Sequence, residues 1–494
     1  MDPRRFAKAN GVPFHRVTKG RQFKLFSAPD GCGAILHFDK LVRERADGSS
    51  GRCEIDLSHL KARAGSAVES RSDEIVAFGD EILHAPELGF KEFRTSDSVA
   101  AFLEGLGFTV KRDIAITGLS ATLDTGRKGP TLALMGELDA LLVSTHPLAD
   151  PVTHAAHACG NNAQLAGLMG AAIALSDAQV LRSLSGRVVF MAVPAEEYVE
   201  IEYRNNLVRE GKLEFLAGKA EFIALGELDD VDLAMMVHSS SLPETAGVVD
   251  SNNGCVAKLV RYIGRAAHAG GSPDKGINAL SAALVAMNAI NALRETFRDE
   301  DSIRVHPIIT RGGELVNVIP SEVTIETYVR GKTVEAIASA ERKVDRALKA
   351  GALVLGAQVE TRTLPGYLPL NNFPELGRLF GDNVDGMFGE GSVTYGGHRA
   401  GSTDMGDVSH ILPTVHPYMG GMSGTGHSAD WKVIDEQLAY VAPGIAMART
   451  AIDLLANDAE AAEKIVDDFQ PRMSRKEYLK YQRGMFRTEL YSGD

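Results

Sequence analysis

The chain carries cysteine and histidine residues of the kind that bind metal ions in enzymes. In the stretch THAAHACGNNAQ, His154, His157 and Cys159 lie close together just before a predicted helix. Cysteine and histidine are the commonest ligands of borderline-soft cations such as zinc. One structural cysteine with two loop histidines would give the same pattern, so this cluster alone leaves a metal site and a structural loop equally open.

A pair of adjacent glutamates, Glu196 and Glu197, follows the strand-like run VVFMAV through Pro194. Neighbouring residues at a strand end can point to opposite sides of the sheet. One carboxylate could therefore bind a metal while the other moves protons, as a general base beside a hydrolytic metal ion must. A solvated acidic turn is the alternative, and for the pair taken alone it is the favoured explanation.

Three further histidines fall in loops. His238 follows the run DLAMMV, His268 lies in GRAAHAGGSPDKGINAL, and His427 lies in GTGHSADW. Each is a weak indication alone. Together with Cys159 and the glutamate pair they make the set that a hydrolytic metal site needs, namely ligands, an adjacent base and a donor to a developing oxyanion.

The elements that would position these residues have the pattern of an α/β sheet covered on both sides. Chemistry in such sheets usually lies at the ends of strands, and Asp139, the glutamate pair and His238 each come just past a predicted strand. The predicted strands are Leu119–Leu123, Thr131–Met135, Val188–Val193 and Leu233–Val237, with a helix at Asn162–Leu175 among the connecting segments.

A second pattern, βαββαβ, interrupts the first and is typical of a small ferredoxin-like α+β sandwich. We therefore expect a catalytic domain of residues 68–254 and 368–456 with an inserted domain of residues 255–367. An N-terminal extension (1–67) and a charged C-terminal tail (457–494), read as a solvated or subunit-contacting arm, complete the chain. The elements of the insertion are strands Val256–Ile263, Ile303–Thr310, Val323–Val329 and Val359–Leu364 and helices Ala279–Leu293 and Val334–Leu355.

Composition excludes several classes of function. The 494 residues carry a formal net charge of −13, which argues against a protein that coats nucleic acid. No apolar run approaches the ~18 residues that would span a bilayer, and no apolar run of a secretory signal follows MDPRRFAKANG. With only 4 cysteines there is no disulfide framework, so we expect a cytoplasmic protein. We expect a small molecule as its substrate, and neither nucleic acid nor a membrane as its partner.

Several ordered motifs over about Val68 to Leu455 resemble the amidohydrolase branch of the aminoacylase and carboxypeptidase G metallopeptidase family. That branch includes N-acyl amino acid, auxin-conjugate and p-aminobenzoyl-glutamate hydrolases. The resemblance implies a metallopeptidase-type α/β catalytic domain with an inserted lid and dimerisation domain, and a homodimer or larger homo-oligomer. The motifs are HAPELGFKEFRTS, GELDAL, HACGNN, PAEE, AAHAGGSPDKGINAL, GGELVNVIPSE, GSTDMGDVS and GHSADW.

The resemblance also implies roles for single residues. Glu196 would be the general base, Asp139 the orienting carboxylate, and His268, contributed by the lid of a partner subunit, would steady the oxyanion. Asn317 and Arg330 would bind polar groups of the substrate, Arg330 by a bidentate grip on a carboxylate. The implied ligands of a divalent transition metal, manganese or zinc with cobalt or nickel also compatible, are Cys159, Glu197, His238 and His427.

One position departs from the family pattern. The family has a histidine two residues after the cysteine, and here that residue is Asn161. Asparagine is a poor replacement for imidazole on such a metal, so we expect one firmly held ion, or a labile second one, unless His154 or His157 substitutes.

The expected activity is hydrolysis of a C–N bond in a small carboxylate-bearing substrate by a metal-activated water. Cleavage of the amide of an N-acyl or aminobenzoyl amino acid is the leading form. Because of Asn161, two alternatives stay open. One is an aminohydrolase that releases ammonia from an aromatic amino acid such as an anthranilate-type amine, and the other is a catalytically degenerate binding protein.

Overall fold

A computed structural model describes residues 57–494 and the backbone of residues 25–27, 32–37 and 40–45. The three short segments are strands β1 (Leu25–Ser27), β2 (Cys32–His37) and β3 (Lys40–Arg45) of an antiparallel sheet. The rest of the predicted extension up to residue 56 lies outside the described residues. Helix α2 (Leu57–Glu69) begins before residue 68, and its Leu60, Ala64 and Val68 pack into the main core.

The catalytic domain is organised around a six-stranded mixed sheet with the order β22-β10-β6-β9-β5-β4. Every residue of the central strand β6 is buried, because helices cover both faces of the sheet. Strands β6, β9 and β10 run parallel, so their predicted ends meet at one edge of the sheet. The strands are β4 (Val110–Ile114), β5 (Gly118–Asp124), β6 (Thr131–Glu137), β9 (Arg187–Val193), β10 (Leu233–Met236) and β22 (Thr414–Val415).

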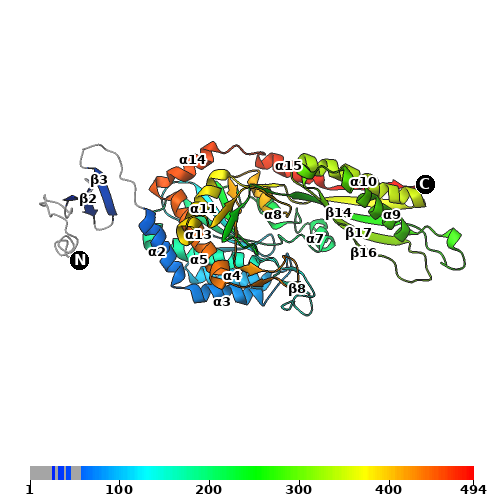
Figure 1. Cartoon of the computed structure of the whole chain (residues 1–494), viewed down its shortest axis with the longest axis horizontal. Helices are drawn as coiled ribbons and strands as arrows, with labels where there is room; N and C mark the ends of the chain where they lie inside the picture. The colour runs from blue at the N-terminus through cyan, green and yellow to red at the C-terminus, as the bar shows by residue number, and fades with distance from the viewer. Residues whose placement is uncertain (1–24, 28–31, 38–39, 46–56) are drawn as a thin grey trace.

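Helix α5 (Asn161–Ser176) is the central helix of the domain and is buried along almost its whole length. It is apolar on all sides, as a helix surrounded by protein must be, and it packs against the sheet, α2, α3 (Ser72–Leu83) and α13 (Ala442–Leu455). Helices α4 (Phe93–Gly105), α8 (Gly218–Leu225) and α11 (Pro374–Phe388) complete the layers (Figure 1).

One described helix, unlike the sequence expectation, is long and apolar enough to cross a membrane by length and composition. It is the continuous stretch of 19 residues Gln437–Leu455, and 83% of its most apolar window is buried inside the protein. Its apolar residues face α5 and the rest of the core, so the composition reflects packing within the domain.

The inserted domain is the ferredoxin-like sandwich that the sequence predicts, with sheet order β15/β16-β17-β14-β18 and helices α9 and α10. The predicted strand Ile303–Thr310 is divided into β15 and β16, because Pro307 has no backbone N–H to give to the ladder. The elements are β14 (Gly254–Ile263), α9 (Ala279–Ala292), β15 (Arg304–Val305), β16 (Ile308–Arg311), β17 (Glu322–Gly331), α10 (Val334–Leu355) and β18 (Gln358–Pro365).

The C-terminal tail is not a solvated arm. It runs along the molecule as α14 (Glu460–Asp468), α15 (Arg475–Met485) and β26 (Arg487–Ser492), and β26 adds an antiparallel strand to β18 of the inserted domain (Figure 1). Tyr478 of α15 is wholly buried. The composition of the tail is charged. One face of α15 nevertheless packs against the rest of the protein, and this face carries Tyr478, Tyr481, Gln482 and Met485.

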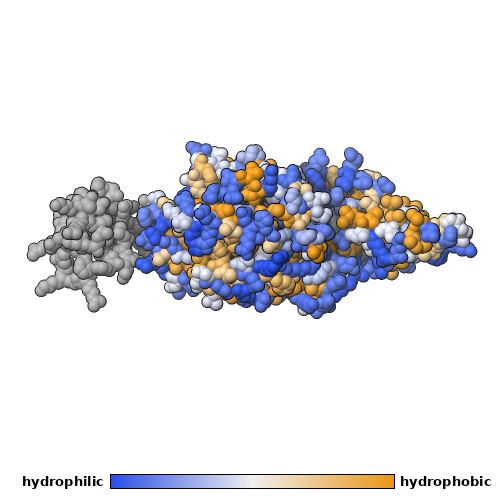
Figure 2. All heavy atoms as spheres, turned by 90° about the horizontal axis from the view of Figure 1, so that it is seen from below, coloured by the Kyte–Doolittle hydropathy of each residue, from blue (hydrophilic) through white to orange (hydrophobic). Residues whose placement is uncertain are grey.

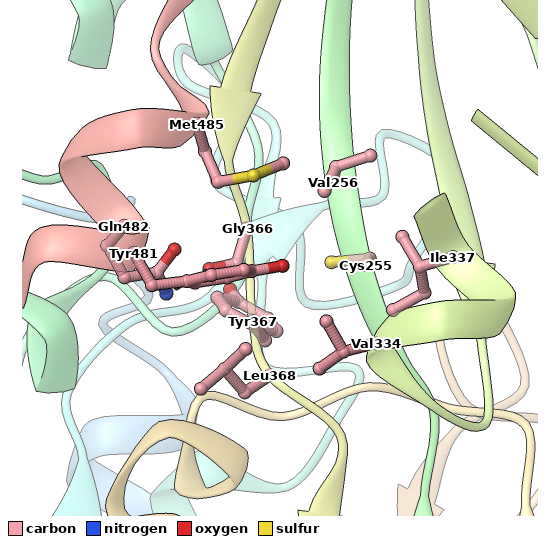
Figure 3. Close-up of a pocket in the computed structure, with 10 residues that line it drawn as sticks. All are labelled: Cys255, Val256, Val334, Ile337, Gly366, Tyr367, Leu368, Tyr481, Gln482 and Met485. Atoms are coloured by element: carbon pink, nitrogen blue, oxygen red, sulfur yellow. Dashed lines mark hydrogen bonds between the residues drawn. The ribbon is translucent and has the colours of Figure 1, made fainter. Parts of the chain in front are cut away.

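Figure 3 shows where this face of α15 lies. Tyr481, Gln482 and Met485 line a small cavity of about 10 Å³ opposite Cys255 of β14 and Ile337 of α10. Residues 366–368, also in the wall, belong to the segment through which the chain returns from the inserted domain to the catalytic domain. The tail therefore covers the junction of the two domains.

The contact between α5 and α13 depends on glycine. A Cβ added at Gly444 would lie 2.7 Å from the carbonyl oxygen of Gly167 and 2.9 Å from the Cα of Gly170.

We expect Gly444→Ala to push the helices apart and to lower the free energy of unfolding by about 1–3 kcal/mol, measured by urea titration. Gly105→Ala is the matched control, because a Cβ there meets nothing within 4 Å; an equal loss in the control would contradict the proposed contact.

Candidate metal centre

The turn that carries Glu196 and Glu197 is fixed by a buried carboxylate. After β9, Ala195 adopts a left-handed backbone with φ 57, which a residue other than glycine adopts only when its surroundings enforce it. Asp139, wholly buried just past β6, accepts the backbone N–H of Glu196 at 3.0 Å and that of Glu197 at 2.9 Å. Two parallel strands thus place their polar ends in direct contact.

Three residues that the sequence analysis did not single out hold the rest of this turn. Glu92 accepts the N–H of Ala195 at 2.8 Å. The buried guanidinium of Arg204 donates to the carbonyls of Ala195 and Glu197, and the hydroxyl of Tyr367 donates to the carbonyl of Glu196. Glu92 lies within the motif HAPELGFKEFRTS, whereas Arg204 and Tyr367 lie in none of the motifs and gave no signal.

Cys159, Glu197 and His427 have ligand atoms within 4.8 Å of one another. His427 Nε2 lies 3.7 Å from Glu197 Oε1, and this buried oxygen has no hydrogen-bond partner in the described part of the chain. A buried carboxylate oxygen left unpaired is costly. Together with the thiol and the imidazole it fits a divalent transition metal, so the structure brings three of the four predicted ligands together.

His238, the fourth predicted ligand, lies on the other side of Cys159. Its Nε2 is 3.5 Å from Cys159 Sγ, and its Nδ1 is 2.8 Å from the carbonyl oxygen of Ser239. A carbonyl only accepts, so in the neutral ring Nδ1 carries the proton and Nε2 presents its lone pair toward the thiol. Cys159 is thus flanked by His238 and by the group of Glu197 and His427.

A further histidine, His416, packs edge-on against His238 with ring centroids 5.6 Å apart. Its Nδ1 donates to the carbonyl of Met236 at 2.9 Å. Burial, followed by the charge of His238, lowers the pKa of His416 to about 3, so the ring is neutral near pH 7. Sequence analysis missed His416, although its place just past strand β22 was a usable signal.

Asn161 stands where the resemblance would place a metal-binding histidine, and both ends of its amide are engaged. Its Nδ2 donates to the carbonyl of Asp139 at 2.8 Å, and its Oδ1 accepts from Gln164 at 3.0 Å. His154 and His157 do not replace it, because neither belongs to the described clusters of metal-binding atoms. His157 is instead buried, and burial lowers its pKa to about 3.

Glu196 faces a different set of side chains from Glu197. Its carboxylate has an oxygen within 4.8 Å of oxygens of Glu137 and Asp404, and all three are buried. Burial, followed by the charges of Glu137, Glu197 and Asp404, raises the pKa of Glu196 well above its usual value, against the opposing charge of Lys219. A carboxylate with a raised pKa takes up a proton more readily, which suits a general base.

His268 and Asn317 lie away from this turn, on the exposed part of the inserted domain. His268 Nδ1 accepts the N–H groups of Gly270 and Gly271, and the N–H of Ala269 donates to the carbonyl of Asn317. Among the described residues, neither side chain hydrogen-bonds to the catalytic domain. The described hydrogen bonds of one chain therefore do not link His268 or Asn317 to Glu196.

Arg330 lines a cavity of about 530 Å³ between the inserted domain and the residues around Ala400. Arg304 and His306 line the same cavity, and these side chains favour an anionic group. The hydroxyl of Tyr328, another wall residue, donates to the carbonyl of Tyr198, the residue after Glu197. The cavity thus adjoins the turn that carries both glutamates.

Comparisons with known proteins fit this geometry. Residues 253–354 match the peptidase dimerisation domain of the M20 family. The Xaa-Arg dipeptidase of Mus musculus is 27% identical over 471 residues, covering 88% of this chain and 98% of the dipeptidase. One chain of the p-aminobenzoyl-glutamate hydrolase of Escherichia coli is 28% identical over 314 residues, or 61% of each of the two proteins. The family model covers the inserted domain, and the two relatives support the M20 amidohydrolase family for the longer stretch of the chain that they match.

A solved M20 structure has the same fold. The dinuclear metal-binding M20 peptidase of Bacillus subtilis matches with a TM-score of 0.58 at 20% identity, covering 78% of this chain and 99% of that one. These matches confirm the family that the motifs indicated and the predicted fold class, an M20 α/β catalytic domain with an inserted lid and dimerisation domain. The roles of single residues stay predictions.

The double hydrogen bond to Asp139 can be tested by an isosteric change. Asp139→Asn replaces one accepting oxygen by an N–H₂ group that faces a backbone N–H. We expect a loss of about 1–3 kcal/mol in the free energy of unfolding and about 100-fold lower turnover as the glutamates shift. Asp150→Asn is the control, because Asp150 also accepts two backbone N–H groups but in an exposed turn. Equal losses in both variants would contradict a special role for Asp139.

Proposed function

We propose that this M20 protein is a metal-dependent hydrolase that cleaves the amide bond of an N-acyl or aminobenzoyl amino acid. The observation that carries the proposal is the fixed turn in which Glu197 joins Cys159 and His427 while Glu196 faces a separate acidic cluster. M20 membership supports the enzyme class, a hydrolase of C–N bonds. The names of the relatives, a dipeptidase and an aminobenzoyl-glutamate hydrolase, support amide substrates.

The roles follow from the geometry. Cys159, Glu197 and His427, with His238 beside the thiol, would hold the ion. When bound, it supplies a Lewis acid that polarises the scissile carbonyl and makes a water molecule more acidic. Glu196 takes the proton of the attacking water and delivers it to the leaving nitrogen, and Asp139 keeps Glu196 in position for both transfers.

The substrate carries a carboxylate in this proposal. Arg330 and Arg304 line the cavity beside the glutamate turn, and a guanidinium binds a carboxylate through two parallel hydrogen bonds. Tyr328 packs beneath Arg330, with its ring centre 5.3 Å from the guanidinium carbon, which limits the directions in which Arg330 can point.

One firmly held ion per chain, manganese or zinc, completes the proposal. The nitrogen and the oxygen of the Asn161 amide are each engaged, by Asp139 and Gln164, so a second ion beside His238 would lack a ligand that the family pattern supplies. Cytoplasmic location is part of the same proposal. It is supported by Cys159 and Cys255, which are free thiols among the described residues, as expected in a reducing compartment.

We further propose a homodimer in which His268 and Asn317 reach the site of the partner subunit. The match to a peptidase dimerisation domain supports the dimer. Figure 2 shows hydrophobic surface over the inserted domain, and the exposed apolar side chains of that domain include Ile308, Leu315 and Val316. Such side chains next to His268 and Asn317 favour an interface there.

Release of ammonia from an aromatic amino acid is the second candidate, and Asn161 is the observation that favours it. Loss of one family ligand leaves a site that differs from a two-metal amide hydrolase. Ammonia from an anthranilate-type amine, with no cleavage of p-aminobenzoyl-glutamate or of dipeptides, would support this candidate over amide hydrolysis.

The base assignment predicts a separation of binding from turnover. Glu196→Gln keeps the shape of the side chain but removes its capacity to take a proton. We expect turnover of the best amide substrate to fall by about 100- to 10,000-fold, with bound metal and substrate affinity unchanged. Glu202→Gln, an exposed position on the next helix, should leave turnover unchanged. Undiminished turnover in Glu196→Gln would refute the base role.

The shared site predicts complementation between two inactive variants. Mixing Glu196→Gln and His268→Ala subunits under conditions of subunit exchange creates dimers with one intact site. For random pairing we expect recovery of about a quarter of the wild-type activity. A mixture that stays as inactive as its components would place His268 in its own subunit's site or outside catalysis. Analytical ultracentrifugation checks that the dimers exchange.

A further inference from the structure

A lysine ammonium lies buried among carboxylates beside Glu196. Lys219 Nζ donates to Glu137 Oε1 at 2.6 Å and to Asp404, and all three side chains are at most 1% exposed. The carboxylate of Glu196 completes a group whose oxygens lie within 4.8 Å of one another. Carboxylates at this depth repel each other strongly unless a cation lies between them.

The backbone holds this lysine in place. Its own N–H donates to Asp404 Oδ2 at 3.0 Å. The preceding residue, Gly218, is the first residue of α8. A Cβ added to Gly218 would lie 1.8 Å from the carbonyl oxygen of Pro194. Glycine alone allows α8 to start so close to the glutamate turn, and the ammonium is thereby fixed relative to Glu196.

Gln164 connects the lysine cluster to the position of the missing histidine. Its Nε2 donates to Glu137 Oε2 at 2.7 Å and to Asn161 Oδ1 at 3.0 Å. Glu137 therefore lies between the Lys219 ammonium and Gln164, and Gln164 extends the hydrogen-bonded network to Asn161.

We propose that the Lys219 ammonium is a built-in cation that occupies the carboxylate cluster of Glu137, Glu196 and Asp404 and so keeps a second metal ion out of it. The inference rests on the proposed function and extends it, because it names the group that makes this site mononuclear. In this arrangement Glu137 and Asp404, which would otherwise be free to bind a divalent ion, are both paired with the Lys219 ammonium.

The test removes the ammonium and counts ions. The wild-type chain, Lys219→Met and Lys258→Met are loaded with Mn²⁺, desalted and measured by elemental analysis, with folding checked by circular dichroism. Lys258 is the matched control: it is also wholly buried between two carboxylates, Glu341 at 3.0 Å and Asp345 at 2.7 Å, but lies in the inserted domain. We expect about one ion in the wild type and in Lys258→Met, and about two in Lys219→Met.

The outcomes separate the two proposals. One ion in folded Lys219→Met would overturn the built-in cation, and so would two in the wild type, while amide hydrolysis by the loaded wild type would leave the proposed function standing. Absence of hydrolysis with the expected ion counts would overturn only the function. Adding Glu137→Gln to Lys219→Met should return the count to about one, because the second ion loses a carboxylate ligand.

A charge-balanced variant covers the case in which Lys219→Met does not fold. Lys219→Met with Asp404→Asn removes one charge of each sign and keeps the carboxylates of Glu137 and Glu196. We expect this variant to bind about two Mn²⁺ ions per chain and to gain more thermal stability from Mn²⁺ than the wild type. One ion and an unchanged stabilisation would show that Lys219 serves only as an ion-pair partner.

Discussion

The site depends on one buried carboxylate that accepts two adjacent backbone N–H groups. Asp139 can do this only because β6 and β9 are parallel neighbours, so that their carboxyl ends meet at one edge of the sheet. The contact imposes a left-handed conformation on Ala195 and directs two consecutive glutamates to different sides. Glu92, Arg204 and Tyr367 then hold the rest of the same turn.

The two sides divide the chemistry between them. On the side of Glu197, a cysteine thiol and imidazoles offer soft and borderline donors, which suit a transition metal. On the side of Glu196, the carboxylates of Glu137 and Asp404 and the ammonium of Lys219 lie close by, so charged groups tune the proton affinity of the base. In the proposed arrangement, the positive charge on this side is carried by a side chain.

Sequence patterns predicted the elements and the ends of strands where Asp139, Glu197 and His238 lie, because hydrophobic periodicity and motifs are local. The partners that hold them are non-local. Lys219 and Arg204 reach the site from helices that lie in none of the motifs, and the sequence analysis singled out neither. The tail was misread for the same reason: its charged composition hid the buried face around Tyr478, whose partners are far away in the sequence.

The tail also constrains how the protein is made. Strand β26 pairs with β18 of the inserted domain, and α15 covers the junction of the two domains. Both are synthesised after every residue of the catalytic domain. On the ribosome the inserted sheet can form its first strands early. The edge of β18 stays unpaired, and the junction of the two domains stays uncovered, until α15 and β26 have been synthesised. Truncation before that point leaves an exposed strand edge, which is a surface for aggregation.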